Sequence, residues 1–410
     1  MNYYNEIKNK LIDNEVYKRV KDYSKNRNDL NTYYEVGKLL IEAQGGENRA
    51  KYGDNLIKEY SKRLFNDIGR KYNITTLKRI RQFYLVVEKG APLAHQLTWS
   101  HYCELLPLKD INEINYFSER NGEKLIADSE NRMSFDILGA AGGIIDAGES
   151  LKAVLVAGPS ASGKTTFAKR LCEVLCAAGT EAKLISLDDF YLGLEYLPKN
   201  EDGTYDMESI SGFDLAGAHK CFADLAENGE ADFPVFDFPN QRRSSETNRI
   251  SLGKNGVLVI EGIYALNPQL TEGIPAKDVM QIYVSTQSRY DSYGRTVLSA
   301  GEVRLLRRAV RDELFRGWPA EKTLAQWKSV LKGEETYINP YIRTADMHIN
   351  TSLAYEPAVL KAALAPALAA ITKESPFFPE AENLMDKLSC FDAINRDIVP
   401  KDSILHEFIG

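Results

Sequence analysis

One glycine-rich segment has residue types and spacing suited to binding phosphate. It reads Gly158-Pro-Ser-Ala-Ser-Gly163-Lys164-Thr165, which is the pattern G-x-x-x-x-G-K-T. Glycines let such a loop curl its backbone N–H groups toward phosphate oxygens, the lysine reaches the β- and γ-phosphates, and the threonine hydroxyl binds Mg²⁺. We therefore expect ATP or GTP to bind here with Mg²⁺. The expected contact residues are Gly158, Ser160, Ala161, Ser162, Gly163, Lys164, Thr165 and Thr166.

Two carboxylates follow apolar runs that have the composition of buried strands. Asp188 lies in Ser-Leu-Asp-Asp-Phe-Tyr, and Glu261 ends Val-Ile-Glu. In an open parallel sheet, ligands bind at the edge where the carboxyl ends of the strands meet. Both carboxylates are therefore expected near the phosphates, and Glu261 resembles the acidic residue of the second nucleotide-binding motif in P-loop proteins.

An arginine-dense segment begins at Glu302 and ends before Gly317. Three of its arginines share one helical face because they are spaced by four and three residues. Asp312 and Glu313 are too few to balance the charge within this segment. We therefore predict a lid that neutralises the transferring phosphoryl group, and a solvated charged face is the alternative. The arginines are Arg304, Arg307, Arg308, Arg311 and Arg316.

Alternating strands and helices must position these residues from Lys152 onward. Such alternation predicts an α/β fold with a parallel sheet covered by helices on both faces. The predicted strands are Ala153–Ala157, Lys183–Leu187, Val257–Ile260, Met280–Val284 and Met347–Asn350. The predicted helices include Thr165–Ala178, Leu215–Asn228 and Glu302–Arg316.

The first part of the chain is predicted to be all-helical. Apolar residues recur at three-and-four spacing in Asn31–Ala43 and Asp54–Gly69, and a helix capped by Thr75 or Thr76 follows. A short helix is expected at Ser100–Leu106. Residues 53–88 thus read as a helix, a glycine-containing turn and a basic helix, which is the layout of a helix-turn-helix.

The charge distribution divides the chain. Residues 1–120 contain 21 Lys and Arg against 16 Asp and Glu, whereas the rest contains 30 against 42. The stretch between the two parts includes Gly-Ala-Ala-Gly-Gly and is interpreted as a flexible linker. The expected domains are residues 1–120, a linker at 121–150, and residues 151–410.

Composition restricts the class of protein. No run of eighteen apolar residues occurs, so no membrane span is expected, and the N-terminus lacks the apolar core of a signal peptide. The five cysteines form no C-x-x-C pair, which favours a reducing compartment, and we expect the cytoplasm. A homo-oligomer is compatible with the sequence.

Six motifs together resemble the uridine kinase/phosphoribulokinase family over about residues 145–410. They are AGPSASGKTTFAKRL, SLDDFY, PVFDFPNQRR, VIEGIYALNP, RLLRRAVRDELFRG and SILHEFIG. The resemblance implies a P-loop kinase that transfers the γ-phosphoryl of ATP or GTP to the 5′-hydroxyl of a nucleoside, with uridine or cytidine expected. It implies Asp188 as the general base that accepts the hydroxyl proton, and Asp188, Glu261 and Thr165 around Mg²⁺.

The resemblance also implies an acceptor pocket and catalytic arginines. Asp206 matches the carboxylate that holds the ribose hydroxyls, and Tyr191 and Phe236 match the aromatic walls, although core packing is the alternative for both aromatics. Arg242 is a further candidate for acceptor binding. Arg308 and Arg311 are expected to act in catalysis, and Arg304 and Arg307 to contact the nucleotide. Classical members have a histidine where this chain reads Pro-Asn-Gln-Arg-Arg, so a sugar or pantothenate-like alcohol is an alternative acceptor.

The N-terminal part resembles a second family. YYEVGKLLIEAQGGENRAKYGDNLIKEYSKRL, TTLKRIRQFY and LTWSHYCELL are similar to the helical N-terminal domain of a bacterial PD-(D/E)xK nuclease family. The resemblance implies DNA binding through residues 53–88, with contacts from Lys78, Arg79 and Arg81. A packing or dimerisation module is the alternative. No D…E-x-K constellation follows, so nuclease activity is not expected.

Two functions of different kinds are compatible with these motifs. The first is an ATP-dependent kinase with an accessory helical domain. The second is a nucleotide-responsive DNA-binding protein whose kinase-like domain senses ligand. Retention of Asp188, Glu261 and the arginine segment favours the enzyme, because a sensor needs no base aligned with the γ-phosphate.

Overall fold

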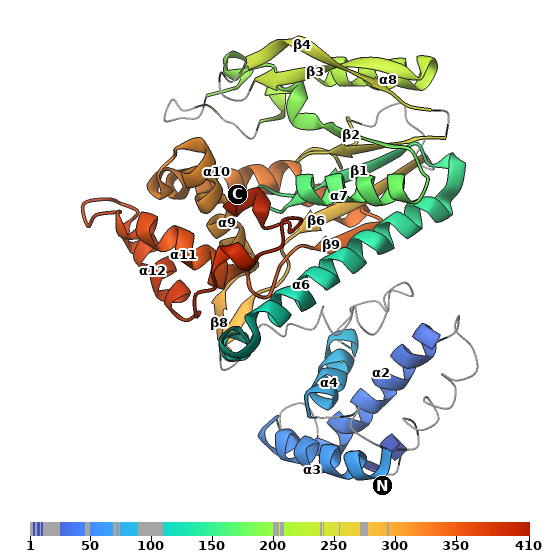
Figure 1. Ribbon diagram of the computed structural model, residues 1–410, viewed down its shortest axis with the longest axis vertical. Coiled ribbons are helices and arrows are strands. Elements are labelled where there is room, and N and C mark those ends of the chain that lie inside the picture. The colour runs from blue at the N-terminus through green and yellow to red at the C-terminus, as the bar shows by residue number, and fades with distance from the viewer. Residues whose placement is uncertain are drawn as a thin grey trace. The chain divides into compact units, whose positions relative to one another are not determined.

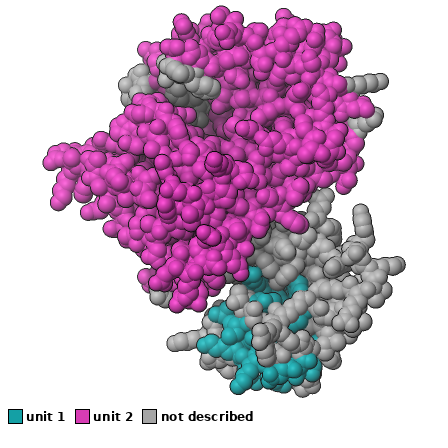
Figure 2. All heavy atoms as spheres, in the orientation of Figure 1, with its two compact units in different colours: residues 1–108 teal, residues 109–410 magenta. Residues whose placement is uncertain are grey.

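The computed structural model describes most of the chain, which divides into two compact units, residues 1–108 and 109–410 (Figure 2). The described residues are 3–4, 6–8, 10, 25–45, 50–68, 72, 74–88, 110–199, 205, 209–237, 240, 242–253, 255–270, 278–292 and 295–410.

The described elements of the first unit are helices, as the apolar spacing predicts. They are α2 (Lys25–Gln44), α3 (Ala50–Ile68) and α4 (Ile74–Glu88). Their shared core includes Val36 and Leu40 of α2, Leu64 of α3, and Ile80 and Phe83 of α4. The short helix expected at Ser100–Leu106 lies outside the described residues.

The second unit begins with a long helix, α6 (Ile111–Ala147), where the sequence suggests a flexible linker. Asp110 caps this helix by accepting a hydrogen bond from the backbone N of Asn112 at 2.9 Å, and the helix is interrupted at Asn121. The glycine- and alanine-rich stretch is helical because Ala140, Ala141 and Ile144 continue a buried stripe of Met133 and Ile137 on the core of this unit.

Hydrogen bonds also attach α6 to distant parts of the second unit. The hydroxyls of Tyr355 and Ser403 both donate to Glu130 Oε1, each at 2.6 Å. Arg132 donates to the backbone carbonyls of Asn350 and Ser352. The helix is therefore an integral part of this unit.

A parallel sheet of five strands forms the centre of the second unit (Figure 1), as predicted. The spatial order is β2-β5-β1-β6-β9. The strands are β1 (Ala153–Ala157), β2 (Ala182–Ser186), β5 (Val257–Glu261), β6 (Val279–Ser285) and β9 (Met347–Asn350).

The central strands β1 and β5 are buried along their whole length. Val154 and Val156 of β1 contribute to a core shared with α6 and with α7 (Lys164–Ala177), whereas Leu155 contributes to a core shared with α8 (Leu215–Asn228). Near-continuous apolar strands are expected when both faces of a parallel sheet are covered.

The remaining described strands and α-helices of the second unit surround this sheet. Strands β3 (Glu230–Asp237) and β4 (Arg242–Ser251) form an antiparallel hairpin that lies beside α8 (Figure 1). A second antiparallel pair consists of β7 (Tyr290–Ser292) and β8 (Arg295–Leu298). The other α-helices are α9 (Ala300–Arg316), α10 (Ala320–Tyr337), α11 (Glu356–Ala369), α12 (Phe378–Ser389) and α13 (His406–Ile409). Among the described helices, none has the length and apolar character needed to cross a membrane.

Candidate functional site

The glycine-rich loop joins β1 to α7, which is the strand-loop-helix context that the motif requires. A Cβ on Gly158 would lie 2.1 Å from the carbonyl oxygen of Val284 in β6, so only glycine fits there. Gly163 has a φ of 83° and precedes the first residue of α7. Ala161, with a φ of 58°, is the only non-glycine among the described residues with a positive φ. The neighbouring strands therefore hold the loop in a curled, strained conformation.

Strand order brings the two predicted carboxylates beside this loop. Glu261 is paired in register with Ser186 of β2 on one side and with Val156 of β1 on the other. Asp188 follows β2 in a short 3₁₀ helix (Leu187–Phe190). Because β5 lies between β2 and β1, Glu261 stands between Asp188 and the loop at the carboxyl edge of the sheet.

Glu261 has the environment of a ligand-binding carboxylate. It is 2% exposed, and its Oε1 accepts a hydrogen bond from the Ser186 hydroxyl at 2.8 Å. Burial raises the pKa of Glu261 to about 7, against the opposing effect of Lys164 and with smaller contributions from Asp188 and Glu407. Its Oε2 is buried and has no hydrogen-bond partner among the described residues. An unpartnered buried carboxylate oxygen fits a hard cation such as Mg²⁺.

Two of the five arginines of α9 support the loop from behind. Arg307 is fully buried, and it pairs with Glu356 of α11 at 2.6 Å and donates to the carbonyls of Ala161 and Ser162 at 3.4 and 3.3 Å. Arg304, 7% exposed, donates to the carbonyl of Ser160 at 3.3 Å and pairs with Glu334 of α10. Both guanidinium groups contact loop carbonyls, whereas the family resemblance implies nucleotide contacts from them.

The other three arginines surround one carboxylate. Asp312, which is fully buried, lies 3.4 Å from Arg308, 3.3 Å from Arg311 and 3.1 Å from Arg316. Arg308 also donates to the Ser160 hydroxyl at 2.8 Å. Partial burial, together with the Arg311 and Arg308 charges, lowers the pKa of Arg316 to about 10, while the Asp312 and Asp188 charges oppose the shift. Three cations against one anion leave positive charge beside the loop and near Asp188.

The arginine helix is not a free lid in this structure. Its residues from Val303 to Val310 are all buried, so it is a core helix with an exposed end after Asp312. Counting charges within the segment overestimates its unbalanced positive charge, because Glu334 and Glu356 of other helices pair with Arg304 and Arg307. Loop support is thus a role that the segment by itself does not reveal.

The expected acceptor side is built around the end of β2 and the β3–β4 hairpin. The rings of Tyr191 and Phe236 lie edge to face with their centroids 6.1 Å apart, and both side chains are partly exposed. Asp189 accepts a hydrogen bond from the backbone N of Phe236 at 3.1 Å, which ties the hairpin to the end of β2. Arg242 is exposed at the start of β4. Asp206 lies outside the described residues.

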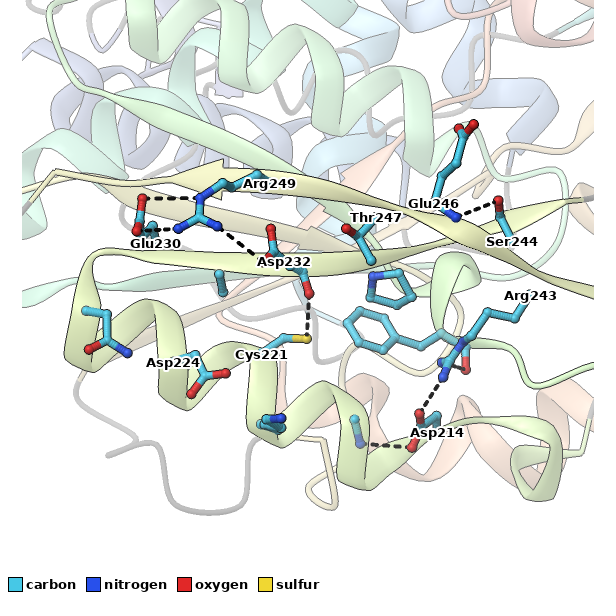
Figure 3. A pocket seen from close by; sticks show the side chains of 16 residues that line it. Asp214, Cys221, Asp224, Glu230, Asp232, Arg243, Ser244, Glu246, Thr247 and Arg249 are labelled. Atoms are coloured by element: carbon cyan, nitrogen blue, oxygen red, sulfur yellow. Dashed lines mark hydrogen bonds and ion pairs between the residues drawn. The ribbon is translucent and has the colours of Figure 1, made fainter.

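A separate groove of about 550 Å³ lies between α8 and the hairpin (Figure 3). An ion pair of Arg249 with Glu230 borders it at one end, and Arg243 pairs with Asp214 at 2.8 Å at the other. Burial raises the pKa of Asp214, but the hydrogen bonds from Arg243 and from the backbone N–H of Gly217 outweigh it and hold this pKa below its ordinary value. None of the site residues predicted from the sequence lines this groove.

Sequence reasoning missed two acidic residues of the site region. In the sequence, Asp312 is only one charge of an arginine-dense segment, whereas in the structure it is buried and pairs with three arginines. Glu407, near the C-terminus, accepts hydrogen bonds from the backbone N and hydroxyl of Thr166 at 3.2 and 2.8 Å. The motif SILHEFIG contributes to the family resemblance, but nothing in its spacing indicates contact with the loop.

Two known families match different parts of this chain. Residues 153–354 match the Phosphoribulokinase / Uridine kinase family, and residues 9–130 match the DUF1016 N-terminal domain. A uridine kinase of Halobacterium salinarum is 31% identical over 48% of this chain and 79% of its own length. One from Staphylococcus haemolyticus is 29% identical over 47% of this chain and 84% of its own length.

A solved structure also aligns with this chain. It is that of a protein from Bacillus stearothermophilus described as a possible uridine kinase, and it is 18% identical, with a TM-score of 0.36 over 54% of this chain and 98% of its own. The family of this chain follows from the match over residues 153–354 and from the 31% identity to the Halobacterium uridine kinase. This chain belongs to the phosphoribulokinase/uridine kinase family and is a phosphotransferase that acts on an alcohol group.

Proposed function

We propose that this enzyme transfers the γ-phosphoryl group of ATP or GTP to the 5′-hydroxyl of a nucleoside, with uridine or cytidine as the acceptor. The observation that carries the proposal is the grouping of Lys164, Asp188 and Glu261 at one edge of the sheet, where the charges of the first two act on the third. The names of the similar uridine kinases support the choice of acceptor.

In this proposal, Asp188 is the general base. Its partly exposed carboxylate accepts the proton of the acceptor hydroxyl while the hydroxyl oxygen forms a bond to the γ-phosphorus. The bond from the γ-phosphorus to the bridging oxygen breaks, and ADP or GDP leaves. Lys164, at the first turn of α7, neutralises the β- and γ-phosphates, and the loop N–H groups orient them.

Glu261 and Thr165 would hold Mg²⁺, with Asp188 as a further candidate ligand. The unpartnered Oε2 of Glu261 supports this assignment. Mg²⁺ usually keeps several waters and takes only one or two protein ligands besides phosphate oxygens, so a dense acidic cage is not required. When bound, the ion would neutralise charge on the β- and γ-phosphates.

The arginines divide into two roles in this proposal. Arg308, Arg311 and Arg316 supply positive charge for the phosphoryl group, because the single negative charge of Asp312, which pairs with all three, does not balance them. Arg304 and Arg307 preorganise the loop by holding its carbonyls on the side away from the inward N–H groups. On the acceptor side, Tyr191, Phe236 and Arg242 are proposed to line the pocket, together with Asp206.

The acceptor is tested by following ATP turnover with a panel of nucleosides, sugars and pantothenate-like alcohols. We expect turnover with uridine or cytidine. Turnover with a sugar or another alcohol, and none with any nucleoside, would show that the proposed acceptor is wrong while the kinase assignment stands.

Two substitutions test the assigned chemistry. Asp188→Asn should lower phosphoryl transfer at least about a hundredfold, because the base is lost, and should leave ATP binding largely intact, because the loop and Lys164 are unchanged. Asp386→Asn on the exposed side of α12 is the matched control and should have no effect. Lys164→Ala should weaken both ATP binding and transfer. A wild-type transfer rate in Asp188→Asn, or unchanged kinetics in Lys164→Ala, contradicts the respective role.

A second function, DNA binding by the first unit, is favoured by one feature of α4. Lys78 is exposed on this helix, and Arg79 and Arg81 are partly exposed next to it. Arg81 donates to Gln44 of α2 at 3.4 Å, so it is already engaged within the unit. A gel shift at low and moderate salt, with these three residues replaced, tests the proposal. A charge-driven complex must weaken as salt rises, and absence of retardation at low salt would exclude it.

A further inference from the structure

The C-terminal segment places a carboxylate on the first turn of the helix that follows the phosphate-binding loop. Glu407 in α13 accepts, through Oε2, hydrogen bonds from the backbone N of Thr166 at 3.2 Å and from its hydroxyl at 2.8 Å. The charge of Glu407 also acts on Glu261, and thus within the proposed site. An anion of the protein itself therefore lies at this helix end.

The backbone N–H of Thr166 is a group that a bound nucleotide would use. The first N–H groups of a helix have no partner within that helix. In α7 the first N–H group that forms a helical hydrogen bond is that of Phe167, which donates to the carbonyl of Gly163 at 3.0 Å. In this motif the backbone N–H groups cradle the α- and β-phosphates, and the lysine reaches the β- and γ-phosphates. The N–H of Thr166, two residues beyond Lys164, therefore falls on the side of the α-phosphate.

The backbone around Glu407 is anchored, whereas its side chain is not fully enclosed. Ile404, Leu405 and Phe408 are each at most 1% exposed. Ile404 lies directly against Gly163, because a Cβ on that glycine would be 2.6 Å from the isoleucine Cδ1. The side chain of Glu407 is partly exposed, so it can rotate while the segment stays in place.

We infer that Glu407 is an internal competitor for the nucleotide, with its carboxylate occupying the position of the α-phosphate. When ATP binds, the carboxylate must release Thr166 and swing outward, or remain beside the triphosphate and repel it. Either way, Glu407 raises the ATP concentration at which the site fills. This inference rests on the proposed binding of a nucleoside triphosphate by the loop.

The test is the dissociation constant for ATP, measured by titration calorimetry on the full chain. The proteins are the wild type, Glu407→Gln, Glu407→Asp and the control Glu382→Gln, which removes one charge from the exposed side of α12. Glu407→Gln should bind ATP at least about fivefold more tightly at low salt, because a like charge is removed from the phosphate site. The gain should shrink as salt rises, since the side chain is partly exposed.

The aspartate variant separates contact from charge and is available should the glutamine variant fail to fold. It keeps the charge but withdraws the carboxylate by one methylene, so a smaller gain in affinity is expected. The control should bind as the wild type does. The inference is overturned when both Glu407 variants bind ATP no more tightly than the wild type. Absence of ATP binding in all four proteins would instead refute the proposed nucleotide site itself.

Discussion

Replacing Arg307 by methionine tests how the fold supports the loop. Methionine retains much of the apolar stem but cannot donate hydrogen bonds. The change removes bonds from Arg307 to Glu356, to the loop carbonyls and to Thr351. Neither the arginine nor the glutamate side chain has any exposed surface. Solvent therefore cannot replace the lost partner of the carboxylate.

The magnitude follows from the contacts that remain. Glu356 keeps two bonds at Oε1, from the backbone N of Leu353 at 2.9 Å and from the Tyr290 hydroxyl at 3.2 Å, while its Oε2 loses Arg307. Removing one member of a buried ion pair costs about 3–5 kcal/mol of unfolding free energy. In the double variant Arg307→Met/Glu356→Gln, the amide oxygen can keep both bonds and no buried charge is left. The coupling free energy between the two sites should therefore be about 1–3 kcal/mol.

Urea unfolding followed by tryptophan fluorescence measures these differences, because Trp327 is 7% exposed and lies in the second unit. Each free-energy change is taken from the shift of the midpoint at constant slope. Arg249→Met is the matched control, since this exposed arginine also forms ion pairs, with Glu230 and Asp232. A midpoint for Arg307→Met equal to that of the control would refute the reasoning from burial.

Three further predictions concern the loop, the long helix and the groove. Gly158→Ala should lower kcat/KM for ATP by about a hundredfold, because the new Cβ would lie 2.1 Å from a carbonyl oxygen and displace the loop. The control Gly301→Ala should leave kcat/KM unchanged, because its Cβ would meet no atom within 4 Å. Ile137→Ala should lower the free energy of unfolding in urea by about 2–5 kcal/mol, because the side chain is buried in the core. Leu138→Ala should lower it far less, because Leu138 is 55% exposed. Equal losses in the two variants would contradict the packing of α6. The pKa of Asp214 is lowered in the folded state, so its contribution to stability is present above its ordinary pKa of 3.8 and is lost as pH falls through the lowered pKa. The difference in thermal midpoint between wild type and Asp214→Asn should therefore be constant near neutral pH and shrink in that acidic range. A difference that does not depend on pH would contradict the lowered pKa.

Local patterns predicted much of the fold and part of the site. The sheet strands were predicted within two residues at each end, because buried parallel strands are continuous apolar runs that end at polar turns. The long helix α6 was missed because glycine and alanine are common both in linkers and in close helix packing. Its buried stripe, which includes Met133 and Ile137, becomes decisive only when a core is present to receive it.

Local residue patterns specify the loop chemistry and the approximate positions of the strands. The spacing from Gly158 to Thr165 is local, and so are the polar residues that follow each apolar run. Which side chains lie next to one another in the site depends on the packing of distant elements. Strand order inserts β5 between β2 and β1 and so puts Glu261 beside Asp188, while Glu334 and Glu356 reach the arginines from other helices. Glu407 meets Thr166 across 241 residues of chain. Such contacts depend on how separate elements pack, and no local pattern of residues specifies that packing.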